Sequence, residues 1–239
     1  MPYAVRGRRD GGPGLDGPYT RYERSTLWLV RGGDCLVGGE EPDAQPEFEA
    51  EVGAFYISKA PLTNLQYEVF RPDHVRAAHG PGDDDPAVGI TFHDAQAYCD
   101  WYSERTGKAF RLPTEVEWEH AAKAETDEAV WFRGPKDAER FVWHAGNSEG
   151  KLHPIESKRA NPFGLFDVLG TVWEWTSSRY APYPVTPGDG RDARDAEVPR
   201  VLRGGSFRSP LAELTCSLRR SASPDLRADD VGFRIVRSL

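Results

Sequence analysis

The stretch NPFGLFDVLGTVWEW, residues 161–175, decides how this chain folds. It is rich in aromatic residues and glycine, yet its apolar residues follow no helical period. The same character holds from Trp131 to the C-terminus, so short strands joined by long ordered loops are expected there. Such a fold needs large side chains to fill the space between irregular segments. Most of these aromatic residues are therefore predicted to lie in the core: Trp131, Phe132, Trp143, Trp173, Trp175, Tyr180 and Tyr183.

The first half of the chain predicts helices. An apolar segment, residues 62–70, is expected to form a short helix. The clearest helical period covers residues 91–106 and stops at Gly107, a favourable residue after a helix end. A third helix is predicted to begin after Thr114, because Thr114 and Glu117 form the capping-box pattern.

Strands are expected towards both ends of the chain. STLWLVRGGDCLVGG, residues 25–39, predicts a β-hairpin with its turn at Gly32 and Gly33. Further strands are predicted within EVPRVLRGGSF, residues 197–207, and DDVGFRIVRSL, residues 229–239. The predicted fold class is α+β, with about two-thirds of the chain in loops.

Length and composition favour a single domain, residues 25–239, after a flexible N-terminal tail, residues 1–24. The formal net charge of -8 disfavours nucleic acid as a partner. No apolar run approaches the length of a membrane span, and the N-terminus lacks the apolar segment of a signal peptide. With only three cysteines, a cytoplasmic protein without a membrane partner is expected.

Five segments resemble the successive signatures of the formylglycine-generating enzyme and sulfatase-modifying factor family. In chain order they are APLTNLQY, TFHDAQAYCDWYSERTGKAFRLPTEVEWEHAAKA, NPFGLFDVLGTVWEW, RVLRGGSF and VGFRIV. The resemblance implies a compact fold with little regular secondary structure, related to the C-type lectin fold. This fold also hosts sulfoxide synthases, pyoverdine-maturation proteins, an inactive sulfatase-modifying-factor paralogue and variable proteins of diversity-generating retroelements. It therefore does not by itself determine the function.

The resemblance also implies a copper site, and this chain lacks its ligands. Family members bind copper through two cysteines that follow a Gly-Gly-Ser-aromatic block, here residues 204–207. The first position is Ser209, and the second falls at Leu214 or near Ala212. A serine hydroxyl is a poor ligand for Cu(I), which prefers thiolates, so copper is not expected. The residues predicted to line the family's active-site region are Ser206, Ser209 and Cys216.

The loop DVLGTVWE, residues 167–174, is a better candidate for a metal site. The resemblance implies a structural calcium ion bound by the carboxylates of Asp167 and Glu174 and the carbonyls of Gly170 and Val172. Calcium prefers six to eight hard oxygens, which a tight loop can bring together. The alternative is a loop without a cation, in which backbone amides bind the glutamate.

A second metal site has a weaker pattern. The resemblance implies a second calcium ion at Asn147 and the Ser148 carbonyl, but the loop that should return an aspartate is short and offers only Glu149. Non-haem iron is an alternative metal, which requires histidines and carboxylates in a facial arrangement. His144 and His153 flank this loop, so an iron site there stays open as a hypothesis.

The C-terminal loop offers a face for a protein, a peptide or a small ligand. Arginine side chains can bind acidic groups there through paired hydrogen bonds. The residues predicted to contact the ligand are Arg208, Ser209, Arg219, Arg220 and Trp173. The first hypothesis is therefore a calcium-stabilised binding module without cysteine-oxidase activity. The alternatives are an iron- or copper-dependent oxidoreductase with a rebuilt active site, and a retroelement-type variable ligand-binding protein.

Overall fold

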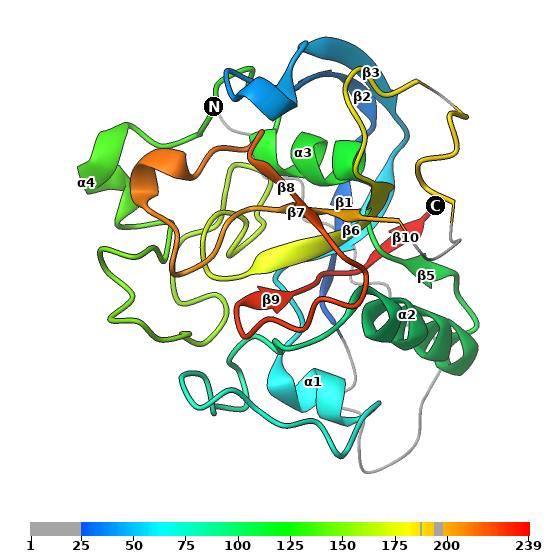
Figure 1. The fold of residues 1–239 in the computed structure, drawn as a ribbon, viewed down its shortest axis with the longest axis vertical. Helices are drawn as coiled ribbons and strands as arrows, with labels where there is room; N and C mark the ends of the chain where they lie inside the picture. Colours follow the sequence, from blue (N-terminus) through cyan, green and yellow to red (C-terminus); the bar gives the residue numbers. More distant parts are fainter. Residues whose placement is uncertain (1–24, 187, 194–197) are drawn as a thin grey trace.

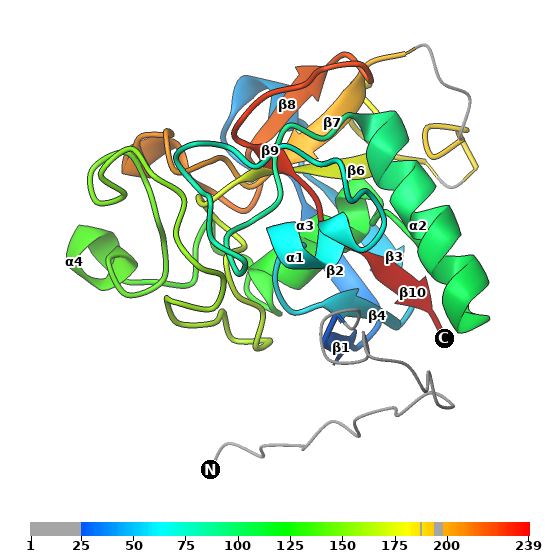
Figure 2. The same ribbon diagram turned by 90° about the horizontal axis from the view of Figure 1, so that it is seen from below.

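The structure, a computed structural model, describes residues 25–186, 188–193 and 198–239 (Figures 1 and 2). The predicted tail, residues 1–24, lies outside the described residues. The helix content is 19% and the strand content 21%, which confirms the α+β class with extensive irregular structure.

All three predicted helices form, and each begins with a capping box. They are α1 (Asn64–Glu68), α2 (Phe92–Thr106) and α3 (Glu115–Lys123). The Thr114 hydroxyl accepts the Glu117 N–H at 3.1 Å, and the Glu117 carboxylate accepts the Thr114 N–H at 2.9 Å. Helix α2 ends at Gly107, whose φ of 66° is left-handed. None of the helices in the described part of the chain has both the length and the apolar content that crossing a membrane requires.

A fourth helix lies where the sequence predicts none. Helix α4, Gly134–Ala138, has a proline in its first turn, and Asp137 accepts the Arg133 N–H at 3.0 Å. Its five residues are too few to show a helical period, so periodicity misses it. The described residues also form two short 3₁₀ helices, η1 (Pro42–Ala44) and η2 (Leu211–Glu213).

The strands of the described residues form three sheets (Figure 1). The first has the order β1-β4-β10-β5 and comprises Leu27–Val30, Phe55–Ser58, Val236–Ser238 and Phe110–Arg111. The second pairs β2 (Gly33–Val37) with β3 (Phe48–Val52). The third has the order β8-β7-β6-β9 and comprises Arg219–Ala222, Arg200–Arg203, Trp173–Arg179 and Val231–Gly232. The predicted C-terminal strands are confirmed, and β10 lies between two strands from the first half of the chain.

The predicted N-terminal hairpin is wrong. Leu27 of β1 lies opposite Ser58 of β4, whereas Gly33 of β2 lies opposite Val52 of β3. The chain passes from one sheet to the other at Gly32, where a Cβ atom would lie 2.5 Å from the Val52 carbonyl oxygen. This glycine permits a close approach of two backbones and does not form a hairpin turn.

The aromatic residues of the second half fill the core in part, as predicted. Trp175 is completely buried and its Nε1 donates to the Ile90 carbonyl at 2.8 Å, which satisfies the indole inside the core. Trp173 and Tyr183 are also buried. The remaining members are only half-buried: Trp131, Phe132, Trp143 and Tyr180.

Three glutamates with no exposed surface join α3 and β6 to the C-terminal segments. Each is paired with an arginine: Glu115 with Arg219, Glu119 with Arg203 and Glu174 with Arg234. Glu115 also pairs with Arg191 at 3.3 Å and Glu119 with Lys123 at 3.0 Å, whereas Arg234 is the one cationic partner of Glu174 among the described residues. Removing Arg234 would leave an uncompensated buried charge, which is strongly destabilising. These pairs therefore hold the loops that carry the candidate site.

Candidate functional site

The loop after β7 brings together the two serines of the predicted active-site region. Gly204 and Gly205 have φ values of 90° and 72°, which turn the chain sharply out of the strand. The Ser206 N–H donates to Ser209 Oγ at 3.1 Å, and the Ser206 hydroxyl donates to Asp230 Oδ2 at 2.8 Å. Both hydroxyls therefore help to shape the loop.

Of the two positions where the resemblance implies copper-binding cysteines, the first holds Ser209 and the second falls at Leu214 or near Ala212. Leu214 is 2% exposed and packs in a hydrophobic cluster with Cys216, which is also buried. Burial raises the pKa of the Cys216 thiol well above its ordinary value. This thiol therefore behaves as a small apolar side chain, and the loop offers Cu(I) no pair of thiolates.

An arginine–aspartate pair covers the loop on its outer side. Arg208 binds Asp229 through both of its terminal nitrogens, with Nη2 and Oδ2 2.8 Å apart. The guanidinium also lies 4.7 Å from the centroid of the Phe207 ring, and the His79 ring packs on the same ring at 5.2 Å. The hydrogen bond from Arg208 holds the pKa of Asp229 below its ordinary value. Since the side chains of Arg208 and Asp229 are 46% and 55% exposed, a ligand can reach both.

Of the other residues predicted to contact a ligand, some are exposed and some are buried. Arg220 is exposed and lies over the ring of the buried Trp173, 5.7 Å from its centroid. The Trp173 N–H donates to the Asp230 carbonyl at 2.9 Å, which connects this region to the serine loop. Arg219 is 4% exposed and binds Glu115 at 2.9 Å. The prediction that Arg219 contacts a ligand is therefore corrected, because its side chain is buried against Glu115.

The predicted calcium loop contains a buried carboxylate. Asp167 is 2% exposed, and its oxygens accept the Glu156 N–H at 2.8 Å and the Thr171 hydroxyl at 3.3 Å. Burial raises the pKa of this carboxyl to about 6, so its partners compensate the negative charge poorly. A cation would compensate it better, and a carboxylate with the carbonyls of Gly170 and Val172 is a donor set that suits calcium.

Glu174 is not free to bind calcium as predicted. Arg234 donates to both of its oxygens, from Nε at 2.6 Å and from Nη2 at 2.8 Å. Trp118 Nε1 donates to Oε2 at 2.7 Å. A guanidinium is thus already the counter-ion of this carboxylate, which corrects the assignment of Glu174 as a calcium ligand. The alternative in which backbone amides bind Glu174 is also wrong, because these partners are side chains.

Thr171 occupies an unfavourable backbone conformation in the same loop. Its φ is 55°, a left-handed value that β-branched residues rarely adopt. We expect Thr171→Asn to raise the free energy of unfolding by about 1 kcal/mol, because asparagine tolerates this conformation and can still donate to Asp167. Urea unfolding followed by tryptophan fluorescence measures the change. Thr171→Val, which keeps the branch and removes the hydroxyl, is the control, and an asparagine variant less stable than wild type would contradict the argument.

The oxygens predicted to bind a second calcium ion already accept hydrogen bonds. Asn147 Oδ1 accepts the His144 N–H at 2.8 Å, and the Ser148 carbonyl accepts a hydrogen bond from His153 Nε2 at 3.0 Å. The side chain of Glu149, which would replace the missing aspartate, is 80% exposed. The geometry therefore gives no support to a calcium ion at Asn147 and Ser148.

The two histidines considered for iron have different partners. His144 Nε2 lies 3.2 Å from Glu139 Oε1. The His153 ring stacks on Trp143 with 3.7 Å between centroids, and its Nε2 binds the Ser148 carbonyl. Within the described ranges, no three His, Cys, Asp or Glu side chains form a group suited to a metal ion. The structure does not bring His144 and His153 into a facial arrangement.

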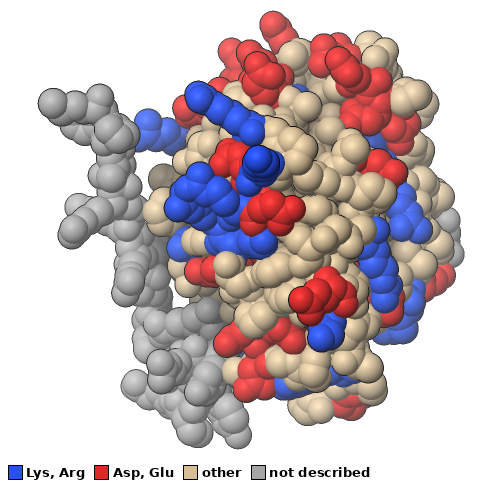
Figure 3. Space-filling view, turned by 90° about the vertical axis from the view of Figure 1, so that its left-hand side faces the viewer, with Lys and Arg blue, Asp and Glu red and all other residues tan. Residues whose placement is uncertain are grey.

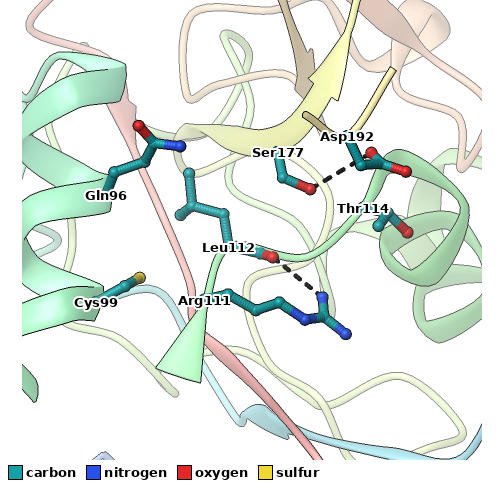
Figure 4. A pocket seen from close by; sticks show the side chains of 7 residues that line it. All are labelled: Gln96, Cys99, Arg111, Leu112, Thr114, Ser177 and Asp192. Carbon is teal, nitrogen blue, oxygen red and sulfur yellow. Dashed lines mark hydrogen bonds between the residues drawn. The ribbon is translucent and has the colours of Figure 1, made fainter. Parts of the chain in front are cut away.

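A cavity of about 160 Å³ lies beside α2 and β5 (Figure 4). Its lining residues are Gln96, Cys99, Arg111, Leu112, Thr114, Ser177 and Asp192. Its charged groups have internal partners, since Arg111 binds Glu117 through two hydrogen bonds of 2.6 Å and Asp192 accepts the Ser178 hydroxyl at 2.5 Å. None of the residues predicted to bind a ligand or a metal lines this cavity.

Sequence reasoning missed the acidic and basic residues around β9. Asp229 and Asp230 bind Arg208 and Ser206, whose positions are 21 and 24 residues away in the chain. Arg234 follows β9 in an otherwise apolar run, and a charged residue in such a run indicates a buried partner. The partner itself, Glu174, is not evident without the fold.

Comparison with known proteins shows the relatives of this chain. The family of sulfatase-modifying factor enzyme 1-like domains matches residues 17–239. Formylglycine-generating enzyme of Mus musculus is 30% identical over 173 residues, which cover 62% of this chain and 43% of the mouse protein. Inactive C-alpha-formylglycine-generating enzyme 2 of Bos taurus is 32% identical over 165 residues, which cover 62% of this chain and 49% of the bovine protein. The alignments therefore span less than half the length of these two relatives.

A solved structure shares the fold. PvdO from Pseudomonas aeruginosa matches with a TM-score of 0.79 and 25% sequence identity, over 89% of this chain and 94% of PvdO. This match agrees with the predicted C-type-lectin-like architecture. Because the family match covers nearly the whole chain, this protein belongs to the family of sulfatase-modifying factor enzyme 1-like domains.

Proposed function

We propose that this chain is a ligand- or protein-binding member of its family that lacks cysteine-oxidase activity. The observation that carries the proposal is the absence of cysteine at the two positions where the resemblance implies copper ligands, Ser209 and either Leu214 or a position near Ala212. The nearby thiol, Cys216, is buried and has a raised pKa. The inactive bovine relative supports the proposal, because it indicates that the family includes members without this activity.

The binding face that we propose is the exposed surface of the serine loop. It comprises Arg208, Ser209 and Arg220, with Asp229 as the present partner of Arg208. A carboxylate of a ligand would compete with Asp229 for the guanidinium, and charge-assisted paired bonds give such recognition both energy and direction. Calcium is proposed as a structural ion bound by Asp167 and the carbonyls of Gly170 and Val172, without a role in chemistry.

We also propose a reducing compartment, the cytoplasm, for this protein. None of its three cysteines forms a disulfide in the described structure, and Cys99 and Cys216 are buried. Burial raises the pKa of the Cys35 thiol to about 11, so it is largely protonated at neutral pH. Free thiols persist most readily in reducing compartments.

The oxidase part of the proposal is tested with a cysteine-containing peptide. We expect the wild-type protein, supplied with copper and oxygen, to leave the peptide thiol unconverted in mass spectrometry, and metal analysis after dialysis to find no stoichiometric copper. Aldehyde formation by the wild type that disappears in Cys216→Ser would overturn the proposal.

The binding part is tested by selecting peptides from a displayed random library on the immobilised protein. Peptides enriched on the wild type are expected to bind an Arg208→Glu/Arg220→Glu variant at least about tenfold more weakly. The matched control is Arg71→Glu/Lys108→Glu, which changes the net charge equally at exposed positions elsewhere. Equal binding to all three proteins, or no enrichment at all, would contradict the proposed face.

A further inference from the structure

A positively charged patch surrounds helix α4 on the face shown in Figure 3. Its cations are Arg133, Lys136, Arg140, Lys158 and Arg159, which we call the α4 basic patch. It contrasts with the formal net charge of -8 of the whole chain. Such a local reversal of sign indicates a surface for an anionic partner.

Backbone and side-chain contacts hold the patch together. Arg140 Nη1 binds Asp137 Oδ1 at 3.1 Å, and the Arg159 N–H donates to the Arg140 carbonyl at 2.8 Å. Lys158 Nζ donates to the Glu139 carbonyl. Residues 158 and 159 are thereby fixed beside α4, although they are about twenty positions away in the chain.

The two carboxylates within the patch are already engaged. Glu139 binds His144 Nε2 at 3.2 Å and Asn147 Nδ2 at 2.7 Å, and the hydrogen bond from Asn147 is the main reason that its pKa lies below the ordinary value. Asp137 accepts hydrogen bonds from the Arg133 N–H and from Arg140. The carboxylates therefore leave much of the positive charge of the patch uncompensated.

Three of the cations have no ion-pair partner among the described residues. They are Arg133, Lys136 and Arg159, and all three are exposed. Like charges held close together repel one another, and binding an anionic group relieves this repulsion.

Aromatic side chains accompany these cations. Lys158 Nζ lies 3.9 Å from the centroid of the Trp143 ring, which is half-buried. Trp131, Phe132 and Phe141 form a half-buried group next to α4, in which the rings of Phe132 and Phe141 stack at 6.3 Å. Arginine and aromatic residues are the types enriched in protein–protein interfaces and among their energetically dominant positions.

We propose that the α4 basic patch binds an acidic segment of a partner protein. A nucleic acid fits less well, because its extended backbone would also meet the acidic remainder of the surface. A membrane fits less well, because α4 has only five residues and cannot present a long apolar face to lipid. A short run of aspartate and glutamate matches the charge and the small extent of the patch. The proposal includes none of the residues of the serine loop and is independent of the function proposed above.

The probe is a fluorescein-labelled glutamate-rich peptide, and its fluorescence anisotropy is measured with the full chain at low ionic strength. The wild type is expected to bind, with an affinity that decreases as salt is added. The variant Arg133→Glu/Lys136→Glu/Arg159→Glu is expected to bind at least about tenfold more weakly. The control Arg31→Glu/Lys108→Glu/Lys151→Glu changes the net charge by the same amount at exposed positions outside the patch. We expect it to change the affinity less than about threefold.

Three results would overturn the proposal. Failure of the wild type, a protein of net negative charge, to bind the peptide at low ionic strength would remove the basis of the proposal. An equal loss of affinity in both triple variants would show that the affinity depends only on the net charge of the protein and not on the α4 basic patch. Tighter binding of an oligothymidine, or of vesicles containing phosphatidylserine, than of the peptide would assign the patch to a different class of partner. Circular dichroism of each variant verifies that the fold is retained.

Discussion

Arg234→Met is expected to lower the free energy of unfolding by about 3–5 kcal/mol. The substitution leaves Glu174 completely buried without the guanidinium that now binds both of its oxygens. It also removes the hydrogen bonds from Arg234 to the carbonyls of Phe166 and Asp167. Urea unfolding followed by tryptophan fluorescence measures the loss.

Two further variants separate the buried charge from other effects. Arg227→Met removes an arginine that is 61% exposed and binds Asp94 at 2.8 Å, and it is expected to cost less than about 1 kcal/mol. In the double variant Arg234→Met/Glu174→Met, no unpaired charge remains, so stability is expected to recover relative to Arg234→Met. Similar losses for Arg227→Met and Arg234→Met, without recovery in the double variant, would contradict the role of Arg234 as counter-ion.

In calcium-free buffer, Asp167 is expected to make the protein less stable as the pH rises through the range of about 4 to 6. Its pKa in the folded protein is raised from 3.8 to about 6 by burial, so the folded state holds this proton more tightly than the unfolded state. The destabilisation is complete above pH 6 and amounts to about 2–3 kcal/mol. Because other carboxylates titrate in the same range, the quantity to measure is the difference between wild type and Asp167→Asn, by urea unfolding at several pH values.

Calcium should change this pH dependence. A bound cation favours the ionised carboxylate, so added calcium is expected to stabilise the wild type more at pH 7 than at about pH 5. Asp167→Asn is expected to lose most of this effect. Identical pH profiles for the two proteins would contradict the titration of Asp167, and an unchanged stability of the wild type on adding calcium at pH 7 would contradict the calcium proposal.

The helices were predictable because their signals are local. Thr114 and Glu117 are three positions apart and cap each other, and Gly107 ends its helix by its own conformation. The serine loop could also be located, since Ser206 directly follows a glycine pair at a strand end and Ser209 lies three positions further on. These features depend on residues that are close together in the chain.

Partners far apart in the chain could not be predicted. The strand β1 pairs with β4 and not with its neighbour β2. The sequence around Gly32 does not reveal this, because the role of this glycine is to let the chain approach residues 52–54, about twenty positions away. Arg219 and Arg220 look alike in the sequence, and only the placement of β8 in its sheet decides that Arg219 is inside. The resemblance implies calcium for Glu174, and the sequence does not reveal the arginine 60 residues away that binds this carboxylate.

The three buried ion pairs also constrain when the chain can fold during its synthesis. All three cations, Arg203, Arg219 and Arg234, lie in the final segment of the chain, whereas their glutamate partners lie between residues 115 and 174. Glu119 also pairs with Lys123 in its own helix and Glu115 with Arg191, but for Glu174 Arg234 is the one cationic partner among the described residues. Until Arg234 has left the ribosome, Glu174 therefore lacks its counter-ion and cannot be buried without a large penalty. The core around Glu174 therefore cannot reach its native packing before the segment that carries Arg234 has emerged.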